Sequence, residues 1–223
     1  MSNAPGRPMG QRYPGYDVLA KRDSPSWNEQ TRAVIEERLA IDPNVHRFFT
    51  DAQWQTMAAV CARIIPQPAE RSKPVPIAAM IDAKLSESRG DGYRDARLPP
   101  QGEAWRRGLT ALEAESQSQY RVPFHELRPL SQDDLLAAIQ KGQTTSAAWG
   151  EMSASLFFAK RLLHDIVTAY YAHPTAWNEI GFGGPAAPRG YVRMDFDRRD
   201  PWEAAEARPG REEQARRENA RVG

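Results

Sequence analysis

The sequence of 223 residues lacks the features that mark several large classes of protein. Its apolar residues form only short runs, whereas a membrane-spanning helix needs roughly 18 or more in succession, and its mean hydropathy is −0.68. Its 30 Lys and Arg residues nearly balance 29 Asp and Glu residues, so no basic excess exists to hold a nucleic-acid backbone. The single cysteine, Cys61, excludes an internal disulfide and a cysteine-based metal site. We therefore expect no transmembrane segment and no nucleic-acid partner.

The chain also lacks the residue spacings that are typical of catalytic, metal and cofactor sites. No two histidines form an HxxxH or HExxH pair, which would place two metal ligands on one helix face. The four histidines are His46, His125, His164 and His173. His164 and Asp165 are neighbours, but adjacent residues of a helix do not face each other, so we expect solvated or capping roles for them. The segment from Gly181 to Pro185 lacks the GxGxxG spacing of a dinucleotide loop. We predict no catalytic, cofactor-binding or metal-binding residue, and an inert buried role for Cys61, with an intersubunit disulfide as the alternative.

Prolines gather near the two ends of the chain, where they block regular helix. We predict an extended N-terminal arm over residues 1–25 and a charged C-terminal tail over residues 197–223, which is either solvated or a partner-binding arm. The first residues show no twin-arginine pair followed by an apolar segment and a cleavage site. This absence predicts a cytoplasmic location, and a periplasmic one if a signal-bearing partner is exported together with the chain.

Between the two ends, apolar residues recur at intervals of three and four, which is the period of an α-helix. The pattern predicts an all-α fold, an irregular bundle of about six helices within a helical domain of residues 26–175. Capping pairs, in which a Ser or Thr precedes an acid or amide by three residues, predict helix starts at Ser26, Thr50 and Ser131. The six predicted helices end before Pro43, before Pro66, near Leu85, before Pro123, at Gly142 and near Ala172.

Apolar stripes and small residues indicate how these helices pack. The first predicted helix places Val34 and Leu39 on its apolar face, and the last one includes Tyr171 in a broad apolar stripe. Gly108 in the fourth helix is small enough to allow a close approach of another helix. Gly142 suits the left-handed conformation that often follows a helix.

A segment rich in glycine and proline follows the last predicted helix. Residues 176–196 show neither a helical nor a strand period, so we predict a docking loop whose glycines allow close approach and whose aromatic side chains anchor a partner. The candidate partner-binding residues of this loop and of the tail are Trp177, Ile180, Gly181, Phe182, Gly183, Gly184, Pro185, Tyr191 and Trp202. A loop that merely closes the end of the bundle explains the same residues equally well.

Three stretches of the chain carry a resemblance to a known family through their order. They read FFTDAQWQTMAAVCARIIPQ from Phe48, WRRGLTALEAESQSQYRVPFHELRPLSQDDLLAAI from Trp105, and AYYAHPTAWNEIGFGGP from Ala169. Taken together, they resemble the gluconate 2-dehydrogenase subunit 3 family over about Phe48 to Tyr191. Each stretch is weakly specific alone, and the ordered set is strongly specific.

The resemblance implies a function for the chain. Members of this family are small, helical, non-catalytic subunits of sugar and polyol dehydrogenases, and their large subunit is a flavoprotein of the glucose-methanol-choline class. The resemblance therefore implies no cofactor in this chain and FAD in the partner. It implies a hetero-oligomer of the gluconate 2-dehydrogenase or glucoside 3-dehydrogenase type, in which this chain binds the large subunit and stabilises or matures it. It also implies an electron acceptor, which is either a cytochrome, such as a cytochrome c partner, or a quinone. The alternative hypothesis is a stand-alone helical interaction module with an unrelated partner.

Overall fold

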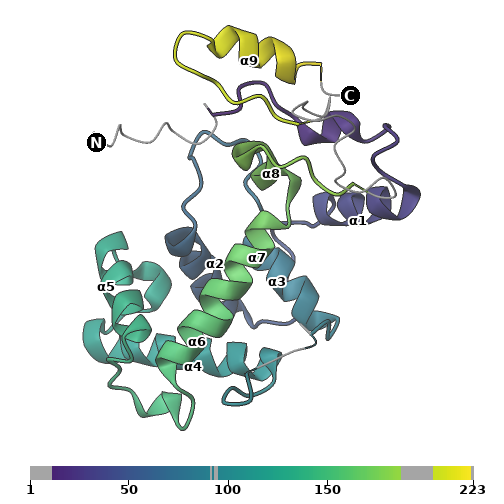
Figure 1. The fold of residues 1–223 in the computed structure, drawn as a ribbon. Coiled ribbons are helices and arrows are strands. Elements are labelled where there is room, and N and C mark those ends of the chain that lie inside the picture. The colour runs from purple at the N-terminus through teal and green to yellow at the C-terminus, as the bar shows by residue number, and fades with distance from the viewer. Residues whose placement is uncertain (1–11, 91, 93–94, 187–202, 222–223) are drawn as a thin grey trace. The chain divides into compact units, whose positions relative to one another are not determined.

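The structure, a computed structural model, describes residues 12–90, 92, 95–186 and 203–221. Within these residues the regular elements are α-helices, short 3₁₀-helices and one π-helical segment, without a strand (Figure 1). This confirms the predicted all-α fold. The chain divides into two compact units, which we call the core unit (Ile41–Tyr170) and the terminal unit (Met1–Ala40 with Tyr171–Gly223). The predicted boundaries at residues 26 and 175 do not coincide with this division.

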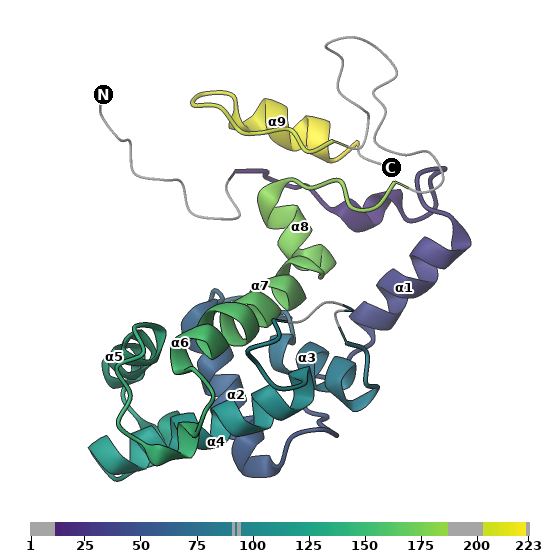
Figure 2. The ribbon, with the colours of Figure 1, turned by 60° about the horizontal axis from the view of Figure 1, so that its bottom comes forward.

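The core unit is a bundle of helices in which α2 and α4 make most of the helix contacts. Its α-helices are α2 (Asp51–Ile64), α3 (Ile77–Ser86), α4 (Gln101–Tyr120), α5 (Pro129–Gln140), α6 (Ala154–Phe157) and α7 (His164–Tyr171). Helix α2 packs against α3, α4 and α5, and α4 also packs against α5 and α6. A π-helical segment, Phe158–Leu163, joins α6 to α7 without a break, so the three form one rod, green in Figures 1 and 2. This rod is the predicted last helix.

Buried aromatic rings fill the centre of the core unit. The rings of Trp105 and Phe157 are fully buried and meet edge to face, with centroids 5.6 Å apart. A Cβ atom at Gly108 would overlap the ring of Phe157. The prediction that Gly108 allows a close approach is therefore confirmed, because this ring occupies the space that a side chain would need.

The helix starts follow the predicted capping pairs in one case of three. Thr50 and Gln53 form a capping box at the start of α2, as predicted. Helix α1 (Glu29–Leu39) is instead capped by Asn28, whose side chain accepts the N–H of Thr31 at 2.9 Å, and Ser26 is fully buried two residues before this cap. Helix α5 begins with Pro129 rather than at Ser131, because proline has the fixed φ of a helix and lacks the N–H that would be unpaired there.

The terminal unit has an aromatic core of its own. Its helices are α1, a 3₁₀-helix (Val18–Lys21), α8 (Pro174–Ile180) and α9 (Glu212–Asn219). Its buried cluster consists of Tyr16, Val18, Trp27, Ile35 and Trp177. The described part of the predicted extended N-terminal arm thus contains a helical turn and supplies core residues. The described part of the predicted C-terminal tail contains a helix.

The two chain ends are tied together by one buried side chain. The amide nitrogen of Asn219 donates to the carbonyls of Pro14 at 2.9 Å and Ala205 at 3.0 Å, and its amide oxygen accepts from the N–H of Ala205 at 2.5 Å. The N–H of Ala207 donates to the carbonyl of Arg12 at 2.8 Å. We call these contacts the terminal clasp. They correct the expectation that the tail is a separate arm, since its polar backbone groups pair with the N-terminal residues.

Candidate partner-binding site

The predicted docking residues lie in the terminal unit, around the end of α8. Residues 176–180 are the end of this helix and not part of a loop, because His173 caps it and Pro174 occupies its first position. Gly181 then adopts a left-handed conformation with φ +66°, and a Cβ there would lie 2.5 Å from the ring of Tyr13. Glycine is therefore required at this position, both for the turn and for the contact.

Trp177 was predicted to be a partner anchor, and the structure places it in the interior instead. Its side chain is 3% exposed, and its indole N–H donates to the carbonyl of Tyr171 at 2.6 Å. The ring of Phe182 packs edge to face on it at 5.7 Å. The helical turn that the sequence pattern missed rotates Trp177 into the aromatic core. Its role is to hold the end of α8 in place.

The segment that follows α8 is also held by internal contacts. The carbonyl of Pro185 accepts a hydrogen bond from the indole N–H of Trp27 at 2.8 Å. Gly184 has φ +66°, and a Cβ there would lie 3.2 Å from both Trp177 and Val18. Gly183 lies between these anchored positions. The backbone of residues 183–185 therefore packs within the terminal unit. Tyr191 and Trp202, also predicted as partner-binding residues, lie outside the described residues.

Three apolar side chains around Trp177 remain open to solvent. Ile180 is 43% exposed, Phe182 is 39% exposed and Tyr171 is 42% exposed. We call Tyr171, Ile180 and Phe182 the α8 patch. Ile180 and Phe182 were predicted as partner-binding residues, and both are exposed. Tyr171 was instead predicted as part of the apolar stripe of the last helix. Apolar periodicity could not show that the core unit ends at Tyr170, one residue before Tyr171.

Five of the nine large apolar side chains that are exposed in the described ranges belong to the terminal unit, and two of these lie on α1. Val34 is 45% exposed and Leu39 is 41% exposed, although the sequence placed both on the apolar face of α1. Only Ile35 of this helix is buried. The prediction of a broad buried face on α1 was wrong. This helix contributes only Ile35 to the buried cluster of the terminal unit, whereas a helix inside a bundle is covered over a wide face.

Buried carboxylates of the core unit hold its loops, and the sequence reasoning did not find them. Glu115 on α4 is fully buried, and its oxygens accept from the N–H of Ser146 at 2.7 Å, the N–H and hydroxyl of Thr145 at 2.8 Å, and the indole of Trp149 at 3.1 Å. Burial alone would raise the pKa of Glu115, but these donors and the amide of Gln119 together hold it below its usual value. Its carboxylate is therefore a fixed structural acceptor.

Asp82 on α3 does the same for the segment before α2. Its carboxylate is 2% exposed and accepts the backbone N–H groups of Arg47 at 2.6 Å, Phe48 at 3.0 Å and Phe49 at 3.0 Å. Three successive N–H groups converge on one charged side chain, which positions this turn on α3. Such a pairing between distant residues leaves no periodic signal in the sequence.

The pair His164 and Asp165 does meet, against the expectation for adjacent helical residues. Nδ1 of His164 lies 3.0 Å from Oδ1 of Asp165. The carboxylate also accepts from the indole of Trp105 at 2.7 Å and the amide of Gln101 at 3.0 Å, and it is 5% exposed. These donors make Asp165 a structural link between α7 and α4.

Cys61 is buried, as predicted, and burial raises the pKa of its thiol far above the usual range. Across the described ranges, no group of three or more His, Cys, Asp or Glu side chains is arranged to hold a metal ion. No helix of this part of the chain combines the length and apolar character needed to cross a membrane.

Comparison with known proteins gives one match. A family model described as gluconate 2-dehydrogenase subunit 3 matches residues 51–184, which is more than half of the chain. The matched range includes every helix of the core unit, α8 and the described residues of the α8 patch. The same comparison finds no match among curated proteins or solved structures.

Proposed function

The chain belongs to the gluconate 2-dehydrogenase subunit 3 family, and we propose that it is the small accessory subunit of a sugar or polyol dehydrogenase whose large subunit carries FAD. The observation that carries the proposal beyond the family is the α8 patch. Tyr171, Ile180 and Phe182 are each about two-fifths exposed, and the buried side chain of Trp177 packs on Phe182 and donates to the carbonyl of Tyr171. Apolar side chains held in this way lose little conformational entropy on binding, which favours association.

The chemistry of the complex then resides in the large subunit. We propose that this subunit supplies the FAD and the substrate site, and that a cytochrome c takes up the electrons. The small subunit contributes a docking surface that stabilises the flavoprotein, and its compartment is that of its partner. The buried carboxylates support a non-catalytic role for this chain. Asp82, Glu115 and Asp165 all accept hydrogen bonds that hold loops and helices of the core unit.

The test is co-purification of the tagged full chain from its native cells, with mass spectrometry of the eluate and its flavin absorbance as readouts. We expect a yellow eluate that contains a large oxidoreductase in stoichiometric amount. Replacing Ile180 by Asp should lower recovery of that subunit at least tenfold, because about 1.4 kcal/mol corresponds to a factor of ten and an unpaired carboxylate is costly to bury.

The matched control is Leu130→Asp, which introduces the same charge at a side chain that is 77% exposed in α5 of the core unit. This variant should co-purify like the unchanged chain. Circular dichroism checks that both variants keep their helices. A colourless eluate without an oxidoreductase would reject the proposal in favour of a helical module with an unrelated partner, and equal losses in both variants would reject the α8 patch as the docking surface.

A further inference from the structure

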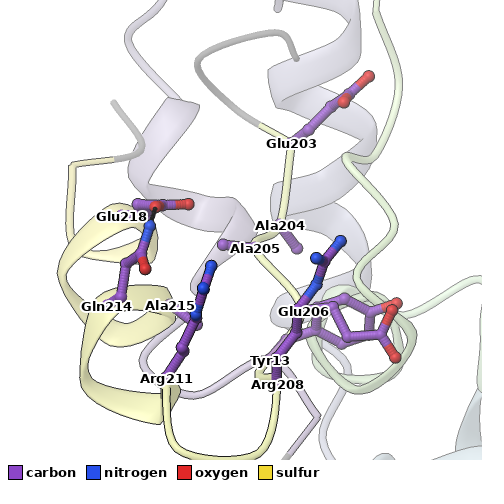
Figure 3. A pocket seen from close by; sticks show the side chains of 10 residues that line it. All are labelled: Tyr13, Glu203, Ala204, Ala205, Glu206, Arg208, Arg211, Gln214, Ala215 and Glu218. Carbon is purple, nitrogen blue, oxygen red and sulfur yellow. Dashed lines mark hydrogen bonds between the residues drawn. The ribbon is translucent and has the colours of Figure 1, made fainter. Parts of the chain in front are cut away.

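A cavity of about 450 Å³ opens within the terminal unit (Figure 3), and its lining includes none of the α8 patch residues. Its walls come from Tyr13, from the segment that runs from Glu203 to Arg211, and from α9. Its lining residues are Tyr13, Glu203, Ala204, Ala205, Glu206, Arg208, Arg211, Gln214, Ala215 and Glu218. A volume of this size lies within the range of about 300–1,000 Å³ that is usual for small-molecule sites.

The acidic groups around the cavity are already engaged. Glu206 accepts from Nε of Arg12 at 2.7 Å, and Glu218 accepts from the amide of Gln214 at 2.9 Å. Glu203 also has an interaction partner. These carboxylates are therefore not the groups that await a ligand.

Two arginines of the lining, Arg208 and Arg211, differ from these glutamates in their contacts. Within the described part of the chain, the guanidinium groups of Arg208 and Arg211 form no hydrogen bond or ion pair. Both belong to one turn, in which the N–H of Arg211 donates to the carbonyl of Arg208 at 2.9 Å and Gly210 has φ +74°. Figure 3 shows both side chains extending from this turn in the same direction.

We propose that this cavity binds a small organic monocarboxylate. A guanidinium presents paired N–H donors that match the two oxygens of a carboxylate, so Arg208 and Arg211 together form the recognition group. The methyl groups of Ala204, Ala205 and Ala215 and the ring of Tyr13 provide apolar surface for the body of the ligand. The glutamates of the lining repel any anion, and they repel a phosphate dianion more strongly than a monoanion, which favours the monoanion.

The proposal is tested by titrating the full chain with benzoate, a flat monocarboxylate, and following backbone amide signals by NMR. We expect saturable shifts at Ala204, Ala205 and Ala215, which line the cavity. The double variant R208A/R211A should weaken the apparent affinity for benzoate at least tenfold. The matched control is R217A/R221A, which removes the same charge at exposed positions outside the lining and should stay within twofold of the unchanged chain.

Sodium chloride and inorganic phosphate at matched ionic strength are titrated in parallel, and circular dichroism verifies the fold of each variant. Equal weakening in both double variants would overturn the proposal, since it would show a general charge effect. It would also be overturned if phosphate or chloride produced the same saturable shifts as benzoate, or if R208A/R211A bound benzoate unchanged. These outcomes do not depend on whether a flavoprotein co-purifies.

Discussion

Single polar residues connect distant parts of this chain, and Glu115 accepts several such hydrogen bonds. Its carboxylate accepts hydrogen bonds from the loop at Thr145 and Ser146 and from Trp149. A charged acceptor in a buried site strengthens each of these bonds. The order of that loop therefore depends on the ionised state of one side chain.

Replacing Glu115 by Gln should lower the free energy of unfolding by about 2 kcal/mol at pH 7, because the amide removes the charge and leaves donors of the loop unpaired. The pKa of Glu115 is held below its ordinary value of 4.5 in the folded state, so its stabilising effect is present above that value. It is lost as the pH falls through the lower folded-state pKa. The difference between the two proteins should therefore shrink at low pH.

Urea unfolding at pH 7 and in a series of acidic buffers measures this difference. The control is Glu103→Gln, because Glu103 pairs only with Arg107 at the surface of the same helix and should contribute less than about 1 kcal/mol. A difference for Glu115→Gln that stays constant with pH would show that packing, and not the charge, stabilises the loop.

Sequence patterns did not reveal the roles of such residues. Glu115 and Asp82 were not singled out by any sequence pattern, yet each is buried and accepts hydrogen bonds from the backbone of a distant loop. Trp177 was expected at the surface and is 3% exposed. Burial of one side chain depends on which segments pack beside it, and this information is not local.

At the scale of helices, the contact between α4 and the α6–α7 rod depends on Gly108, which has no side chain. Position 108 faces the ring of Phe157, and a Cβ there would overlap that ring. Trp105, one turn earlier on α4, packs on the same ring. The two elements therefore meet only because glycine occupies this position.

Gly108→Ala should destabilise the chain by about 1–2 kcal/mol, although alanine favours the helical state by about 1 kcal/mol, because overpacking a buried site costs more. Thermal or urea unfolding measures the effect. The control is Ser118→Ala at an exposed position of α4, which changes helix propensity alone. Combining Gly108→Ala with Phe157→Leu should recover part of the loss, and a gain in stability from Gly108→Ala alone would disprove the contact.

Helices were the part of the fold that the sequence predicted best. Apolar periodicity predicted α2, α3, α4 and the α6–α7 rod, because their buried faces repeat along the chain. Their starts were less certain, since a Ser three residues before an acid occurs by chance as well as in caps. Helix α8 was missed because seven residues are too few to show a period.

At the scale of the whole molecule, the terminal clasp joins residues that are about 200 positions apart in sequence. Asn219 bonds to Pro14 across 205 residues and is 2% exposed. The aromatic cluster around Trp177 likewise combines residues from both ends of the chain. The terminal unit is therefore a folded body made from the two ends.

Asn219→Ala should open this clasp, since it leaves the carbonyl of Pro14 and both backbone groups of Ala205 without their partner. Amide hydrogen exchange should become at least tenfold faster in residues 12–16 and 203–221 and stay unchanged in the core unit, which has its own core. The control is Gln214→Ala on the same helix, whose side chain bonds only to Glu218. Unchanged exchange at both ends would show that the clasp does not stabilise them.

The amino-acid sequence by itself determined the helical class, the positions of most long helices and the family, because periodicity and ordered motifs are local properties of the chain. Only the tertiary structure decided that the two ends fold together, that Trp177 is interior while Tyr171, Ile180 and Phe182 are exposed, and that Arg208 and Arg211 share a cavity. The physical reason is that burial and pairing depend on contacts between residues far apart in sequence, which a local pattern does not encode.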